Sequence, residues 1–173
     1  MAEPLCCKGV VETTMGLDAF VYCNCYETGR HKTPPPQGIE IEVSPDGSIN
    51  CAHETVDAAI AIYAWTHQQA CDHEDCTFLH HYIGNIAFVA FLRETLQRNA
   101  EKFPTILSKV IYNGIHGGDY LTLQQVNLVR EELAHFSSVA CDNEEDQQYL
   151  DTFRGQLTEL VNCALELQKP IAF

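Results

Sequence analysis

Residues 67–81 read HQQACDHEDCTFLHH and gather sulfur and imidazole side chains more densely than any other stretch of the chain. His67 and Cys71 are four residues apart, and so are Cys76 and His80. Residues four apart lie on the same face of a helix, and the polar run between the two pairs is short enough to connect antiparallel helices. The pattern therefore predicts a helical hairpin at whose junction the two pairs meet.

This hairpin is a candidate zinc site. Zinc prefers four ligands at the corners of a tetrahedron, and thiolate sulfur and imidazole nitrogen are common donors. The predicted ligands are His67, Cys71, Cys76 and His80. His73 and His81 are alternative ligands, and Asp72 or Asp75 could orient an imidazole from behind. Because four protein ligands leave no position for a substrate water, we expect a structural rather than a catalytic ion.

Two other interpretations use the same cysteines. Cys23 and Cys25 are two apart in a strand pattern, so their thiols share a face and could join Cys71 and Cys76 in an all-thiolate site. Against that arrangement, C-x-C is a tighter pair than the usual C-x2-C, and Val21 on the same face is typical of a core. In the other interpretation no metal is bound, because free cysteines pack as small hydrophobes and acids are favourable at a helix start.

A redox or catalytic cysteine is not expected. No Lys or Arg flanks Cys71 or Cys76 to favour the reactive thiolate, and the neighbouring acids disfavour it. The chain contains no G-x-S-x-G, H-E-x-x-H or G-x-G-x-x-G motif, so we expect a non-catalytic protein. His116 and Asp119 flank two glycines and could suggest an enzyme, but glycines of this kind are better explained by a connecting loop.

The residues before this stretch have the pattern of strands. Residues 17–26 are rich in aromatic and β-branched side chains, and residues 39–43 alternate apolar side chains with Glu. A Ser-Pro-Asp-Gly turn at 44–47 leads to a returning strand at 48–51. Three prolines at 34–36 mark the loop after the first strand. We expect a small N-terminal antiparallel sheet of about three strands.

Helical patterns follow. The first four predicted helices cover residues 55–71, 75–99, 104–113 and 122–138, and the fifth is capped by Asp142 or Asn143 and ends at Pro170. The first carries Val56, Ile60 and Tyr63 along one stripe, as an amphipathic helix does. Thr122 with Gln125 forms a capping box at the start of the fourth. Together these patterns predict an α+β fold in which the sheet precedes a five-helix assembly. We expect residues 1–14 to be an N-terminal tail and residues 15–173 to form a single domain.

The charge of the chain favours some partners over others. It carries 24 acidic residues against 10 Lys and Arg, a net charge of −14. Such a surface repels phosphate groups, so neither nucleic acid nor a membrane is an expected partner. A second hypothesis is therefore an acidic interaction module, of inhibitor or immunity type, that neutralises a basic protein. The sequence leaves a homo-oligomer open.

The expected compartment is the cytoplasm. The N-terminal residues lack the basic and apolar regions of a signal peptide. The cysteines number nine, so they cannot all pair within the chain, and we expect them to be reduced thiols.

Overall fold

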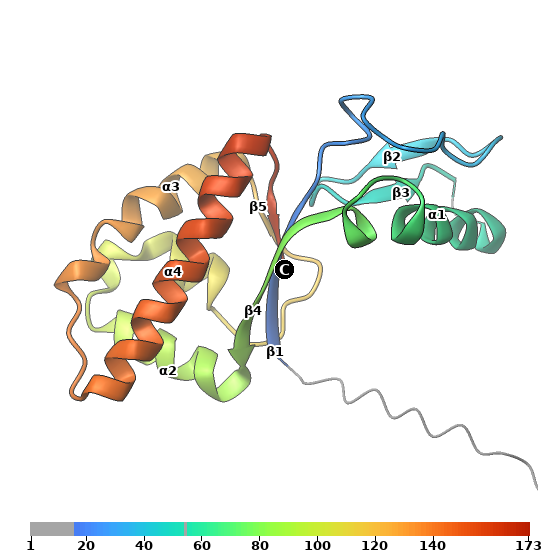
Figure 1. Cartoon of the computed structure of the whole chain (residues 1–173). Coiled ribbons are helices and arrows are strands. Elements are labelled where there is room, and N and C mark those ends of the chain that lie inside the picture. Colours follow the sequence, from blue (N-terminus) through green and yellow to red (C-terminus); the bar gives the residue numbers. More distant parts are fainter. Residues whose placement is uncertain (1–15, 54) are drawn as a thin grey trace, which may run out of the picture.

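The chain divides in space into two parts, which lie side by side in Figure 1. The computed structural model describes residues 16–53 and 55–173, and it confirms the predicted α+β class. The tail predicted at 1–14 lies outside these residues. We call residues 23–76 the lobe, and residues 16–22 together with 77–173 the body.

The body is built on a four-stranded antiparallel sheet in the order β4-β1-β6-β5. Its strands are β1 (Gly16–Tyr22), β4 (Thr77–Asn85), β5 (Tyr120–Leu121) and β6 (Ile171–Ala172). The longest pairing joins β1 to β4 and runs from Gly16 opposite Asn85 to Tyr22 opposite Thr77. Every second residue of β1, beginning with Leu17, is buried. The strand therefore presents one face to the core.

The prediction of a single three-stranded sheet is wrong, because its members belong to two different sheets. β2 (Ile41–Val43) and β3 (Ile49–Cys51) pair with each other in a two-stranded sheet within the lobe. β1 instead takes its partners from distant parts of the chain, with β4 on one edge and β6 on the other. The turn between β2 and β3 is confirmed, since Gly47 N donates to Ser44 O at 2.8 Å.

The prediction that a helix begins at residue 75 is also wrong. Residues 77–85 form β4, because their aromatic and β-branched side chains suit a strand and their backbone pairs with β1. Asn85 then caps the following helix, its side chain accepting a hydrogen bond from Phe88 N at 2.9 Å. The helical hairpin on which the predicted zinc ligands would meet is therefore not formed.

Four α-helices are present among the described residues. They are α1 (Val56–Gln68), α2 (Ile86–Gln97), α3 (Leu123–Leu133) and α4 (Glu144–Leu167). The shorter helical turns are η1 (Glu74–Cys76), η2 (Ala100–Lys102), η3 (Ile106–Val110) and η4 (Phe136–Ser138). The predicted helix at 104–113 is thus reduced to η3, a π-helical turn. The capping box of α3 is confirmed: Gln125 N donates to Thr122 Oγ1, and Thr122 N donates to Gln125 Oε1.

Helices α2, α3 and α4 lie on one side of the body's sheet, whereas α1 belongs to the lobe (Figure 1). The two ends of the lobe meet directly beyond the last β1–β4 pair, where Cys23 N donates to Cys76 O at 2.7 Å. Side chains also join the lobe to the body, and Asn24 Nδ2 donates to Leu167 O at 3.4 Å. Lys169, buried just after α4, places its ammonium 2.6 Å from Glu27 Oε2 and 3.4 Å from Gly47 O. Both ends of the lobe therefore leave the sheet at one narrow neck.

Candidate metal centre

Three thiols and one imidazole come together where the lobe meets this neck. The ligand atoms of Cys23, Cys25, Cys71 and His73 all lie within 4.8 Å of one another. Cys23 Sγ lies 3.6 Å from Cys71 Sγ, and Cys25 Sγ lies 3.5 Å from His73 Nδ1. A fifth donor, Cys76 Sγ, lies 4.0 Å from Cys71 Sγ. We call these five residues the thiol cluster.

Two short segments, about fifty residues apart in sequence, present these side chains. Cys23 and Cys25 follow β1, and a loop closed by a hydrogen bond from Arg30 N to Cys25 O (2.7 Å) holds them in place. Cys71 and His73 follow α1, and Lys32 N binds Ala70 O at 2.7 Å to tie this segment to the first. The topology therefore positions the donors in two pairs.

The backbone beside the cluster adopts an uncommon conformation. Asp75 and Cys76 are consecutive non-glycine residues with φ of 50° and 56°. The left-handed region is unfavourable for residues with a Cβ, and such residues gather at functional sites, where surrounding contacts hold them. Here the two residues reverse the chain so that it can enter β4 while the Cys76 thiol stays in the interior.

The spacing of the donors fits a tetrahedral zinc ion. With Zn–S bonds of about 2.3 Å and Zn–N bonds of about 2.0–2.1 Å, two sulfurs lie about 3.8 Å apart and a sulfur lies about 3.6 Å from a nitrogen. Here Cys23 Sγ lies 3.6 Å from Cys71 Sγ and Cys25 Sγ lies 3.5 Å from His73 Nδ1, and the other pairs among these four residues lie within 4.8 Å. The cluster could therefore hold zinc with small movements of its side chains.

Apolar residues cover one side of the cluster, where Cys23, Cys25 and Cys76 are buried, whereas Cys71 and His73 are half-buried. Cys23, Cys25 and Cys76 form a small core with Trp65 and Ala70, separate from the core of the body. The Trp65 indole N–H is satisfied by the Thr33 backbone carbonyl at 3.1 Å, so the ring closes one wall of the site without leaving a buried donor unpaired.

The surroundings of Cys23, Cys25 and Cys71 raise the pKa of each thiol and so favour its protonated form. Hydrogen bonding to Cys76 and burial raise the pKa of the Cys23 thiol, and burial raises the pKa of Cys25. Burial also raises the pKa of Cys71 to about 11. Desolvation and thiol contacts, rather than the neighbouring acids, are thus what disfavours the thiolate in this structure.

The two histidines of the predicted ligand set are not part of the thiol cluster, and each lies against a carboxylate instead. His67 Nδ1 is 2.5 Å from Asp75 Oδ1. His80 points from β4 to β1, where its Nε2 is 2.7 Å from Asp18 Oδ1 and its ring stacks on Phe20. The spacing of four that would align each histidine with a cysteine applies to helices, and residues 77–85 are a strand.

The structure brings the two cysteines of that set, Cys71 and Cys76, together with their sulfurs 4.0 Å apart. Cys23 and Cys25, which the sequence places in the alternative all-thiolate site, join them, and His73 is one of the alternative ligands. The sequence signal that matches the structure is therefore C-x-C at 23–25 with C-x-H at 71–73. In each pair one residue separates two donors.

The other candidate residues serve the fold. His116 is buried against Tyr112 and Phe173, and its Nε2 lies 2.9 Å from Val110 O. Asp119 accepts a hydrogen bond from the Tyr112 hydroxyl. The His116 imidazole and the Asp119 carboxylate thus contact nearby residues of the same loop and its flanks, as expected for a connecting loop packed against the body.

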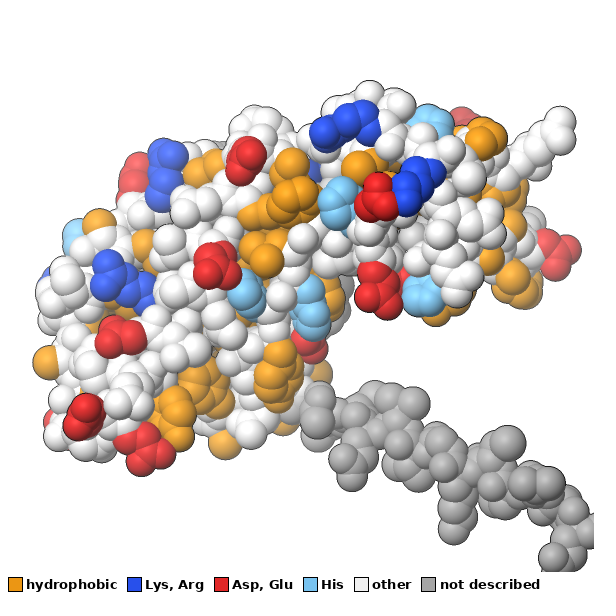
Figure 2. Space-filling model, in the orientation of Figure 1, with side chains coloured by type: hydrophobic (Ala, Val, Ile, Leu, Met, Phe, Trp, Pro, Cys, Tyr) orange, Lys and Arg blue, Asp and Glu red, His pale blue; other side chains and the backbone are white. Residues whose placement is uncertain are grey.

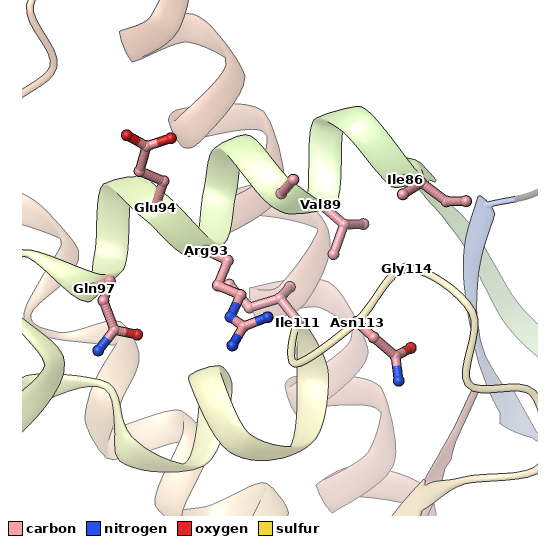
Figure 3. Close-up of a pocket in the computed structure, with 9 residues that line it drawn as sticks. Ile86, Val89, Arg93, Glu94, Gln97, Ile111, Asn113 and Gly114 are labelled. Atoms are coloured by element: carbon pink, nitrogen blue, oxygen red, sulfur yellow. The ribbon is translucent and has the colours of Figure 1, made fainter.

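A hollow of about 620 Å³ lies between α2 and residues 111–114 (Figure 3). Val89 and Ile111 are part of its apolar wall, and Arg93 points across it. The Arg93 guanidinium donates to Tyr112 O at 2.9 Å, and Asn113 Oδ1 accepts from Ile115 N at 2.9 Å. Arg93 therefore holds the adjoining turn against α2, and Asn113 closes the turn itself.

Comparisons with known proteins give no match: no family model, curated protein or solved structure matches this chain. Within residues 16–53 and 55–173, no helix has the length and apolar character needed to cross a membrane.

Proposed function

We propose that the protein binds a structural zinc ion through Cys23, Cys25, Cys71 and His73. The observation that carries this proposal is the convergence of these four ligand atoms within 4.8 Å of one another. Soft thiolate donors with one imidazole favour zinc over the harder cations magnesium and calcium. Four protein ligands fill the tetrahedron, so the ion has no open position for a substrate and its role is structural.

The size of the lobe gives the ion a task. The lobe spans 54 residues (76 − 23 + 1), and its core consists of five buried residues, three of them cysteines. Chain segments of fewer than about 70 residues rarely bury enough apolar surface to hold together, and a structural metal is a common remedy. Zinc at the cluster would join the residues after β1 to the residues after α1, and so hold α1 in place.

The proposal implies a reducing environment such as the cytoplasm, in which the cysteines remain available as ligands. Binding would release the thiol protons, since zinc is held by thiolates. Zinc affinity should therefore rise with pH.

The metal content of purified protein tests the proposal. Protein prepared without chelators should contain about one equivalent of zinc by mass spectrometry of the elements, and less than about a tenth of an equivalent would contradict the proposal. Cys25→Ser and Cys71→Ser should lose the metal. Cys163→Ser, which removes a buried thiol from α4, is the matched control and should retain it.

A second measurement remains informative if a variant does not fold. Trp65 is the single tryptophan of the chain and lies in the same small core as the thiols. Chelating zinc from the intact protein should change its fluorescence, and adding zinc back should restore it. Zinc that is present but whose removal leaves Trp65 unchanged would place the ion elsewhere and overturn this site.

The fourth ligand can be identified separately. His73→Ala should weaken zinc binding at least tenfold if His73 is a ligand. Cys76→Ser should have a smaller effect, because Cys76 is not one of the four residues whose ligand atoms converge and its Sγ also contacts Thr66 O at 3.7 Å. The opposite order would assign the site to the four thiols Cys23, Cys25, Cys71 and Cys76.

A further inference from the structure

Helix α1 exposes an apolar stripe. Val56, Ile60 and Tyr63 are 76%, 62% and 66% exposed, although their spacing of four and three places them on one face. The helix attaches to the lobe through its other side, where Ile62 and Trp65 are buried. Because the helix is apolar on both sides, one of its sides remains without a partner among the described residues.

This face is continuous with a hollow of the lobe. Val56 and Tyr63 line a space of about 440 Å³ together with Ile49 and Cys51 of β3. In Figure 2, hydrophobic side chains reach the surface at the outer end of the lobe, on the right of the view. A helix face beside a shallow apolar groove is the arrangement that receives an amphipathic helix from another protein.

The stretch of chain that carries the face is acidic, and His53 Nε2 lies 3.7 Å from Glu40 Oε2 within it. Residues 33–92 contain eight acidic residues and not a single Lys or Arg. Glu40 and Asp57 line a second hollow of about 430 Å³ at the start of α1. The two cations nearest along the chain are engaged: Arg30 binds Asn24 Oδ1 at 2.6 Å, and Lys32 pairs with Asp72.

We propose that the exposed face of α1 is a docking site for a basic amphipathic helix of a partner protein. The apolar side of that helix would pack on Val56, Ile60 and Tyr63, and its Lys or Arg residues would meet the acidic rim that includes Glu40 and Asp57. A second copy of this chain would bring the same acidic rim and be repelled, and an anionic membrane would be repelled likewise. The surface therefore suits a cationic protein helix.

A synthetic helix of Leu and Lys provides a defined probe. A labelled peptide of about 14 residues with Leu on one face and Lys on the other should bind the full-length, metal-replete protein in an anisotropy titration. Ile60→Ser with Tyr63→Ser should weaken its binding at least tenfold while leaving every charge in place. Leu128→Ser, which removes an exposed apolar side chain from α3, should leave binding unchanged. Raising the salt from about 50 to about 500 mM should weaken binding several-fold.

Each other outcome would overturn the proposal. Peptide binding that survives the double substitution would show non-specific attraction to an acidic surface. A loss of peptide binding in the Leu128→Ser variant equal to that in the double variant would show that the exposed face of α1 is not the binding site. Absence of binding to the unaltered protein would also contradict it. Sedimentation equilibrium gives a separate check: a dimer that dissociates in the Ile60→Ser, Tyr63→Ser variant would show that a second copy covers the face. Circular dichroism of each variant, matched to the unaltered protein, confirms that the fold is retained.

Discussion

Replacing Glu132 by Ala should destabilise the body by about 2–6 kcal/mol. Glu132 is buried on α3, and its carboxylate accepts hydrogen bonds from Thr105 N at 2.7 Å and Ile106 N at 2.8 Å. Both donors are backbone N–H groups at the start of the η3 turn. Such groups are ordinarily hydrogen-bonded by a capping side chain next to the turn, and η3 has no such cap. Removing the carboxylate leaves two buried donors unpaired, and each costs about 1–3 kcal/mol.

Urea denaturation followed by far-UV circular dichroism measures this cost. Glu131→Ala, one residue earlier on the exposed side of α3, removes the same charge and is the matched control. It should change the free energy of unfolding by less than about 0.5 kcal/mol. Glu132→Gln should fall between the two, because its amide oxygen can still accept one of the hydrogen bonds. A loss below about 1 kcal/mol for Glu132→Ala, or a loss equal to that of the control, would refute the reasoning.

Two further predictions concern the body. Gly84→Ala should lower the free energy of unfolding by several kcal/mol in urea denaturation, because Gly84 has φ of 154° and an added Cβ would lie 2.3 Å from Phe88 Cδ1. Gly117→Ala, where the added Cβ meets open space, is the control, and an equal effect of the two substitutions would contradict the prediction. His116 should make the protein less stable as the pH falls below about 6.5, because burial lowers the pKa of its imidazole and the unfolded chain therefore takes up the proton first. Between pH 7 and 5 the free energy of unfolding of His116→Gln should therefore decrease less steeply with falling pH than that of the unaltered protein. The two slopes should differ by up to about 1.4 kcal/mol per pH unit, and equal slopes would show that the imidazole is not held neutral.

Local signals in the sequence predicted the elements whose ends are marked by polar caps. Thr122 and Gln125 begin α3 as expected, and Asn143, one of two predicted caps, begins α4 with its side chain accepting from Asp146 N. The turn before β3 was equally clear from its Pro and Gly. Each of these signals depends on residues within four positions of one another, so no knowledge of the rest of the fold is needed.

The structure differs where the deciding contacts are distant. Residues 77–85 have apolar side chains at positions compatible with either a helix or a strand, and pairing with β1 decides between them. The two-residue strands β5 and β6 are too short to show any alternation. They exist because the edges of neighbouring strands offer free backbone groups.

The same distant pairing explains what could be predicted of the thiol cluster. Cys71 and Cys76 were recognisable from their density in the sequence, and their neighbours Cys23 and Cys25 from the C-x-C spacing. Their meeting follows from the β1–β4 pair, which brings the residue after Tyr22 beside the residue before Thr77. Without β4 there was no reason to prefer that arrangement over a helical hairpin.

The strand order also has a consequence for how the protein is made. β1 is synthesised first but lies in the interior of the sheet, between β4 and β6. Phe20 of β1 pairs with Ala172, which the ribosome adds 152 residues later (172 − 20). At about 5–20 residues per second, this interval lasts roughly 8–30 s. During that time one edge of an apolar strand has no partner, so the sheet can close only when synthesis has reached β6, and the nascent body needs protection from association until then.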